Sequence, residues 1–508
     1  MILRSRVRLA AVTAALALAC GLIITAASRQ PGQPSLALEG IAQDPCAPQN
    51  VLAVPDAVTG WYLPGSSVLR TRAGIYVAPG RPVPVTTVQA ACDREAARAS
   101  QQWLAAGTIP GAPGQQRSMA TRALLDLRLL TRPDGAVVAA WHSGWRYAWP
   151  RDSSWAAVAL ADTGHTADAF RVLRFLQRMQ LPDGTWAARY WPDGAGPVRD
   201  GRPAELDATG WVPWAVWSWA AALRPDDRAG RRQLALLWPM VEAAASAAGR
   251  SLTSDGLPTA SMDYWEDSVT VTLGTAGPLL AGLRAAAELA ADLGARADEQ
   301  RWSLAAVRLS GAIATEFGRY GYHRLPEGTS GADAAISFLG LPFAAAGPSL
   351  DQAARTADAA LALPGGGVRP GTDWPGRPGV TWTAETAFFA LLWASTGDHQ
   401  RSAAILAWLA AHRTRLGELP EQVNARGQPV SVAPLAWTDA VVLLALIAQR
   451  QHLPVPPALP APAASPARPA GGPATTAQVR HWACMSPRPE RAVSGCHGRP
   501  RRWRRSRG

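Results

Sequence analysis

The chain is 508 residues long, carries a formal net charge of +12, and contains 22 Trp but only seven Phe. Its length suffices for one large helical body with tails. Residues 477–508 hold nine Arg and one Glu, which gives +8, and the first eight residues add +3, so only +1 of the total remains for the rest. Because the central part keeps no basic stripe, we expect no binding of nucleic acid.

The N-terminus has the pattern of an export signal. Residues 1–8 are basic, residues 9–27 are uncharged and apolar, and small residues stand at positions 25–28. This order predicts a signal peptide in residues 1–28. The apolar run also approaches the length that spans a bilayer, so a retained membrane anchor through residues 9–27 is the competing interpretation. Either way, we expect the protein outside the cytoplasm, secreted or held on the outer face of the membrane.

Residues 40–85 hold short apolar runs that are separated by Gly and Pro. Such runs predict strands in a short β-rich lead-in. Cys46 and Cys92 bracket this segment, and because export permits disulfides, we expect them to pair. No Cys and His spacing resembles a zinc site, and we expect neither a metal nor another cofactor.

From residue 86 to about residue 452 the pattern changes to Ala-, Leu- and Arg-rich stretches with helical periodicity. Each stretch ends near Gly, Pro or an Asp-Gly pair, as helices do. We predict twelve helices, near 86–106, 116–131, 153–163, 166–179, 206–223, 227–249, 274–293, 297–317, 350–362, 381–396, 399–414 and 434–449.

The connections between these helices repeat loosely. Asp-Gly turns at 134–135, 183–184 and 255–256 each follow a helix and precede a short segment with a nearby Trp. Such recurrence is typical of an (α/α) toroid in which alternate loops meet at one mouth. Trp side chains in loops suit stacking on sugars, whereas Trp214, Trp217 and Trp219 lie within a predicted helix and are expected in the core or the barrel lining.

Two carboxylates about 155 residues apart suggest acid/base chemistry. Glu266 is flanked by aromatic rings and two further carboxylates, and this setting should keep it protonated near neutrality. Glu421 has no acidic neighbour closer than Glu418 and should stay ionised. Cleavage of a glycosidic bond requires such a proton donor and a separate acceptor. The alternative is that Asp267 and Ser268 simply cap a helix.

Beyond the helical part, residues 453–477 are rich in Pro and Ala and predict an extended linker. Residues 478–508 are Arg-rich and predict a disordered tail.

Six short motifs occur in order between roughly residues 115 and 450. They are Tyr147-Ala148-Trp149-Pro150-Arg151-Asp152, Leu206-Asp207-Ala208-Thr209-Gly210, Asp263-Tyr264-Trp265-Glu266, Gly365-Gly366-Gly367-Val368-Arg369, Leu419-Pro420-Glu421-Gln422 and Pro434-Leu435-Ala436-Trp437. Each motif is weak alone, but together they resemble glycoside hydrolase family 15, the glucoamylase-like enzymes.

The resemblance implies an all-α fold, an (α/α)6 barrel over residues 86–452. It also implies an enzyme that releases terminal glucose from α-linked glucans with inversion at the anomeric carbon. In this sequence Glu266 resembles the general acid and Glu421 the general base. The residues expected to contact the sugar are Trp149, Arg151, Asp152, Trp265, Asp267, Arg369 and Trp437. The partner is then an oligo- or polysaccharide, and we expect a monomer.

Two departures from the family pattern bear on the substrate. Asp267 stands where the family commonly has a second Glu, and the residues after Arg369 differ from the sequence that is usual in the family. Two other interpretations stay open. The same fold could act on trehalose, dextran or a wall-derived oligosaccharide, or a non-catalytic surface protein could bind glycan through a Trp-lined mouth.

Overall fold

The computed structural model describes residues 35–224, 226–345 and 347–457. The predicted export signal or anchor in residues 1–28, the tail in 478–508 and most of the predicted linker lie outside these residues. Within the described part, no helix combines the length and the apolar character needed to cross a bilayer.

The described residues form twelve α-helices, and each corresponds to a helix predicted from the sequence. They are α2 (Thr87–Ala105), α3 (Gln115–Leu130), α4 (Pro150–Asp162), α5 (Thr166–Met179), α6 (Ala208–Ala221), α7 (Arg228–Arg250), α8 (Leu273–Asp292), α9 (Arg296–Ala312), α10 (Pro348–Leu361), α11 (Thr383–Ser395), α12 (His399–Ala411) and α13 (Ala436–Ala448). Short 3-10 or π turns are η1 (Ser143–Trp145), η2 (Ile313–Phe317), η3 (Gly318–Tyr320), η4 (Pro326–Gly328) and η5 (Ala334–Leu339).

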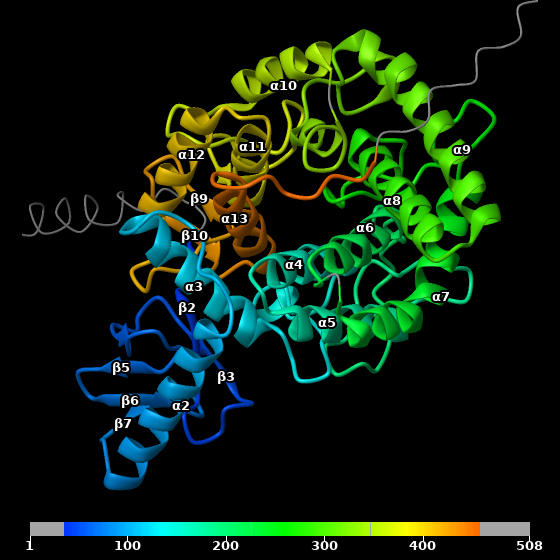
Figure 1. Cartoon of the computed structure of the whole chain (residues 1–508). Helices are drawn as coiled ribbons and strands as arrows, with labels where there is room; N and C mark the ends of the chain where they lie inside the picture. Colours follow the sequence, from blue (N-terminus) through cyan, green and yellow to red (C-terminus); the bar gives the residue numbers. More distant parts are fainter. Residues whose placement is uncertain (1–34, 225, 346, 458–508) are drawn as a thin grey trace, which may run out of the picture. The chain divides into compact units, whose positions relative to one another are not determined.

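The helices form two concentric rings (Figure 1). In the inner ring, α13, α4, α6, α8, η5 and α11 each pack against the next, and α11 returns to α13. The outer ring is α3, α5, α7, α9, α10 and α12, each packed on an inner element. This is the expected (α/α)6 barrel. One predicted helix, α2, lies outside both rings, and the sixth inner position belongs to η5, which has only six residues.

The inner helices are buried because they are apolar on every side. In α6, Trp214 and Trp219 are at most 2% exposed and Trp217 is 7% exposed, which confirms that they belong to the core. The helices α6 and α8 approach closely at Gly210, where an added Cβ would lie 2.1 Å from the carbonyl oxygen of Pro278. Glycine is therefore required at this crossing.

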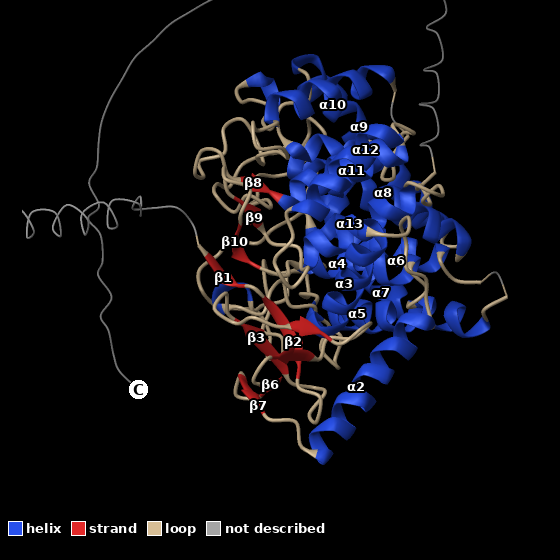
Figure 2. Cartoon of the chain, turned by 90° about the vertical axis from the view of Figure 1, so that its left-hand side faces the viewer, coloured by secondary structure: helices blue, strands red, loops and turns tan. Residues whose placement is uncertain are grey.

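The strands gather at one side of the helices (Figure 2). They are β1 (Leu36–Leu38), β2 (Gly40–Gln43), β3 (Val51–Val54), β4 (Trp61–Tyr62), β5 (Leu69–Thr71), β6 (Gly74–Val77), β7 (Arg81–Val83), β8 (Thr381–Trp382), β9 (Gln422–Val423) and β10 (Pro429–Val432). The antiparallel pair β2-β3 and the antiparallel sheet β4-β5-β6-β7 make up the lead-in. A third sheet has the order β1-β10-β9-β8, with β1 parallel to β10. The β-structure therefore begins before residue 40, with β1, which pairs with β10 about 390 residues later in the sequence.

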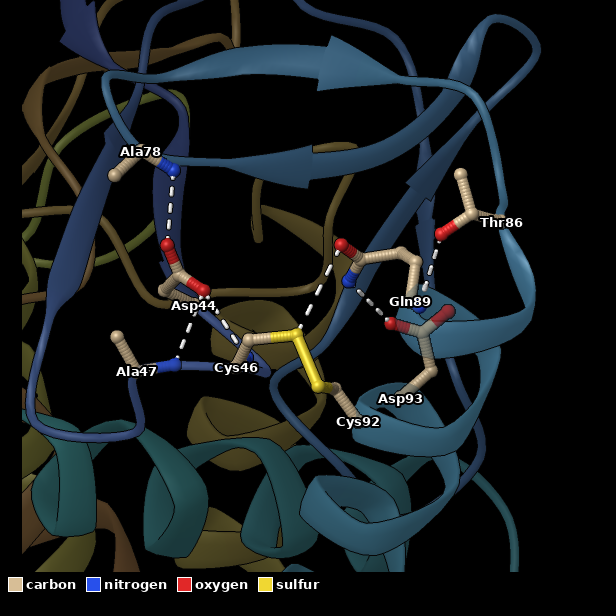
Figure 3. The surroundings of a disulfide bond; sticks show 8 residues. All are labelled: Asp44, Cys46, Ala47, Ala78, Thr86, Gln89, Cys92 and Asp93. Carbon is tan, nitrogen blue, oxygen red and sulfur yellow. Dashed lines mark hydrogen bonds between the residues drawn. A yellow bond between two sulfur atoms is a disulfide. The ribbon is translucent and has the colours of Figure 1, made fainter.

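Cys46 and Cys92 form the disulfide expected from the sequence (Figure 3). Cys46 lies in the loop between β2 and β3, and Cys92 lies on α2. Next to the bond, the Asp44 carboxylate accepts backbone N–H groups from Cys46, Ala47 and Ala78 at 3.0–3.2 Å. The disulfide ties the lead-in to α2, and the Asp44 carboxylate ties the loop around Cys46 to Ala78, the residue after β6.

The first five residues of the predicted linker, 453–457, are described and pack on the barrel. Nη2 of Arg284, on α8, donates hydrogen bonds to the carbonyl oxygens of Pro456 at 3.2 Å and Pro457 at 2.6 Å. The barrel therefore extends a few residues beyond the predicted boundary at 452.

Candidate active site

One pocket, with a volume of about 380 Å³, opens where several inner helices begin. Trp149 precedes α4, Trp382 precedes α11 and Leu435 precedes α13, and all three line it. The full lining is Ala139, Gly144, Trp145, Trp149, Arg151, Asp152, Arg189, Arg202, Tyr264, Trp265, Glu266, Pro370, Trp374, Trp382, Ala384, Glu385, Glu421, Leu435 and Trp437. The loops before the inner helices thus meet at one mouth.

Glu266 reaches the pocket from the loop between α7 and α8. Its backbone has φ = +55°, a left-handed conformation that is uncommon outside glycine and that concentrates at active sites. Oε1 accepts a 3.0 Å hydrogen bond from the indole N–H of Trp149. Oε2 forms an ion pair with Arg202.

The acidic neighbours of Glu266 do not act on it as the sequence suggested. Both carboxylate oxygens of Asp263 bind Arg324, at 2.7 and 2.9 Å, and Asp267 lies 3.3 Å from the same guanidinium. Arg324 also pairs with Asp333, so this one cation partly offsets the charges of three carboxylates, and Glu266 itself contacts a cation, Arg202. The like-charge repulsion predicted for Glu266 is therefore weakened by ion pairs that the sequence did not indicate. Asp267 does not line the pocket, so its predicted sugar contact is not supported. It does not cap α8 either, since that cap is Thr272.

Glu421 immediately precedes β9, and its side chain lines the pocket. Its Oε1 accepts a 2.9 Å hydrogen bond from the indole N–H of Trp145, and its Oε2 accepts one from the Ser431 hydroxyl. Burial raises the pKa of Glu421, while these two hydrogen bonds oppose the rise. The sequence pointed to an ordinary ionised carboxylate with Glu418 as its nearest acidic neighbour. In the fold, the charge of Glu421 instead acts on Asp152 and Glu385, and it raises the pKa of both.

Arg151 lines the pocket, but part of its guanidinium is already bound by protein. Its Nη1 donates to Glu205 at 2.5 Å and to Asp207 at 3.1 Å, and the group lies 4.9 Å from the centre of the Trp437 ring. Asp152 lies beside it with 3.7 Å between the charged atoms. Burial raises the pKa of Asp152 to about 6, against the attraction of Arg151. The predicted Arg-Asp pair is therefore present, and Glu205 and Asp207 hold Arg151 in place.

Indole rings form one wall of the pocket. Trp265 meets Trp374 edge to face with 5.0 Å between ring centres, and Trp374 meets Trp382 in the same way at 5.1 Å. The buried Nε1 atoms of Trp265, Trp374 and Trp437 have no hydrogen-bond acceptor among the described residues. The wall thus offers flat apolar faces, while these indole nitrogens are themselves buried.

Seven of the predicted site residues line this pocket, namely Trp149, Arg151, Asp152, Trp265, Glu266, Glu421 and Trp437. Arg369 does not. Its backbone N–H bonds to Leu361 and its Nη2 to Ala360, at 3.4 Å, so the chain turns its side chain away and Pro370 lines the pocket instead.

Sequence reasoning missed several residues of the site, among them Trp145, Arg189, Arg202, Trp374, Trp382, Glu385 and Ser431. In the sequence, Trp145 stands four residues before Trp149, and Glu385 resembles an ordinary acid in the first turn of a helix. No group of three or more His, Cys, Asp or Glu within the described chain is arranged to hold a metal ion.

No protein-family model matches the chain. An uncharacterized glycosyl hydrolase of Methanocaldococcus jannaschii is 25% identical over 350 residues, which are 64% of this chain and 55% of that protein. The chain thus spans about half the length of this curated relative.

Solved structures share the fold. A glycosidase variant in complex with glucose matches with a TM-score of 0.54 and 21% identity, over 68% of this chain and 98% of its own. A bacterial glucoamylase complexed with acarbose matches with a TM-score of 0.57 and 16% identity, over 72% of this chain and 60% of its own. These similarities establish the (α/α)6 barrel.

Proposed function

We propose that this protein is an inverting glycoside hydrolase of the glucoamylase-like family that releases terminal glucose from α-linked glucans. The observation that carries the proposal is that Glu266 and Glu421 reach one pocket from different loops, each with one oxygen held by an indole N–H. The order of the six motifs and the glycosyl hydrolase relative support the family.

In the proposed reaction Glu266 is the general acid. It gives its proton to the glycosidic oxygen while the bond from that oxygen to the anomeric carbon breaks. Glu421 is the general base. It takes a proton from a water molecule, whose oxygen forms the new bond to the anomeric carbon from the opposite side. Hydrogen bonds from Trp145 and Ser431 favour the charged form of Glu421 that can accept this proton.

The lining of the pocket suits a sugar. The guanidinium groups of Arg189 and Arg202 and the carboxyl groups of Asp152 and Glu385 line the pocket and offer both hydrogen-bond donors and acceptors. A sugar hydroxyl can form a hydrogen bond with either kind of group, because it both donates and accepts. The indole faces match the C–H faces of a sugar ring.

We also propose that the protein acts outside the cytoplasm. The apolar run in residues 9–27 supports export, and so does the Cys46–Cys92 disulfide, since such bonds persist in oxidising compartments.

The test is hydrolysis of maltooligosaccharides, isomaltooligosaccharides, dextran and trehalose, with the anomeric proton of the released sugar followed by NMR. The proposal expects immediate release of β-glucose from an α-linked substrate. Early release of α-glucose would contradict inversion. Binding of these sugars without turnover would favour the non-catalytic interpretation.

Two variants test the assigned roles. Glu266→Gln and Glu421→Gln should each lower kcat about 100-fold or more, because each removes a proton-transfer group. Glu418→Gln is the matched comparison for folding, because Glu418 is also a buried carboxyl but lies outside the pocket. Normal turnover by either pocket variant would reassign its role.

A further inference from the structure

Glu385 is a carboxyl group in the pocket that the proposed reaction does not use. It stands in the first turn of α11 and is only 4% exposed. Its Oε2 has no hydrogen-bond partner in the described part of the chain. Other buried carboxyls also have unbonded oxygens, as both oxygens of Asp439 show, but Asp439 does not line the pocket, whereas Glu385 does.

The backbone places Glu385 beside Glu421. The N–H of Thr383 donates to the carbonyl oxygen of Glu421 at 3.1 Å, and the Thr383 hydroxyl donates to the carbonyl oxygen of Pro420 at 2.5 Å. The start of α11 is therefore fixed to the segment that carries the proposed base. The side chains of Glu385 and Glu421 line the same pocket from these two tied segments.

The surroundings of Glu385 favour its neutral form. Burial raises its pKa to about 8, and the charges of Glu421 and Asp333 add to this effect, while Arg151 opposes it. Tyr264 also lies within electrostatic reach. At neutral pH the carboxyl thus holds its proton and carries an O–H donor as well as an acceptor oxygen.

We infer that Glu385 binds one hydroxyl group of the terminal sugar and selects sugars that carry this hydroxyl in the correct position. The inference rests on the proposed function, since it assumes a sugar in this pocket. It assigns Glu385 to recognition and leaves proton transfer to Glu266 and Glu421. A buried group built to bind a hydroxyl strongly rejects an analogue without it, because the group is then left unpaired.

The test pairs protein variants with deoxy substrates. The full chain and its Glu385→Ala and Glu385→Met variants are assayed on the preferred glucoside and on analogues that each lack one hydroxyl of the terminal ring. In the unmodified protein, one analogue should lose about 10-fold or more in kcat/KM. Each variant should lose a similar factor on the intact glucoside and show no further loss on that analogue. Glu385→Gln keeps a donor and should retain most of the discrimination.

Equal discrimination among all the analogues by the unmodified protein and both variants would overturn the inference. The Met variant keeps the length of the side chain, so a failure of the Ala variant to fold does not prevent the test. Thermal unfolding of each variant accompanies the kinetics. A loss that is uniform across all substrates indicates a structural role and also overturns the inference.

A binding measurement can test the role of Glu385 even if the proposed hydrolysis is not observed. If the unmodified protein hydrolyses none of the glucosides, the proposed function fails, and titration with glucose and its deoxy analogues, read by tryptophan fluorescence, decides the role of Glu385. Loss of affinity for one analogue that disappears in the Met variant would support the inference. Absence of glucose binding, or equal discrimination by both proteins, would overturn it.

Discussion

The indole N–H of Trp145 donates a 2.9 Å hydrogen bond to Oε1 of Glu421, which lies 276 residues further along the chain. This bond favours the charged carboxylate and so opposes the rise in pKa that burial causes. A base that must accept a proton from water depends on such support.

Replacing Trp145 with Phe should therefore lower kcat about 10-fold at neutral pH, because the carboxylate loses a hydrogen bond to its charged form. The acidic limb of the pH profile of kcat/KM should move to higher pH. Trp141→Phe is the control, since Trp141 packs against Arg146 and does not line the pocket. A Trp145→Phe profile that superimposes on that of the unmodified enzyme would contradict this account.

The ion pair between Arg202 and Glu266 predicts a second pH effect. A guanidinium against the carboxylate favours its charged form, whereas a general acid must hold a proton. Arg202→Ala should therefore extend activity toward alkaline pH and raise the ratio of kcat/KM at pH 8 to that at pH 6. Arg199 is exposed and lies outside the pocket, so Arg199→Ala should leave this ratio unchanged. An unchanged ratio in Arg202→Ala would show that the ion pair is not kept in the working enzyme.

Asp162 predicts a dependence of stability on pH that is independent of catalysis. It ends α4, and burial raises its pKa to about 7, far above the value of about 3.9 expected in the unfolded chain. Its contribution to stability is therefore complete below about pH 4 and is lost as the pH rises to 7. Asn resembles the protonated acid and avoids this loss.

The Tm of Asp162→Asn relative to that of the unmodified protein should thus increase between pH 4 and pH 7 and stay constant above it. Thermal unfolding at several pH values measures the difference. Glu95→Gln, on the exposed face of α2, serves as the control and should show a constant offset. A constant offset for Asp162→Asn as well would refute the assignment.

The Cys46–Cys92 disulfide should stabilise the lead-in. Replacing both residues with Ala should lower the free energy of unfolding by about 2–4 kcal/mol, because the unfolded chain regains the freedom that the cross-link removes. A reducing agent should lower the Tm of the unmodified protein and leave that of the double variant unchanged. Equal sensitivity of both proteins would mean that the effect arises elsewhere.

The helices were predictable because their signals are local. Each of the twelve has its own apolar periodicity and its own stop signal, so its existence does not depend on distant residues. The exception is η5, the sixth inner element, whose six residues are too few to show a helical period. Its place in the ring is set by the packing of α8 and α11 on either side.

The site was predictable only where a motif marked it. Glu266 and Glu421 stand in recognisable strings, but their surroundings come from residues far away in the sequence. Arg324 forms ion pairs with the carboxylates of Asp263 and Asp267, and Arg202 places a cation against Glu266 itself. Long-range pairing of this kind decides whether a carboxyl is charged, and no local pattern contains it.

The short strand β1 has a consequence for how the protein can be altered. It flanks β10, where the N–H of Ala433 donates to the carbonyl oxygen of Leu38 at 3.0 Å. The strand β10 carries Ser431, whose hydroxyl holds Glu421, and Val432, whose carbonyl accepts the Glu421 N–H at 2.8 Å. Residues 36–38, just ahead of the lead-in, therefore support the strand that holds the proposed base. Trimming the chain at residue 40, or fusing a partner directly to it, would loosen the proposed base from behind and alter turnover while the pocket itself keeps every side chain.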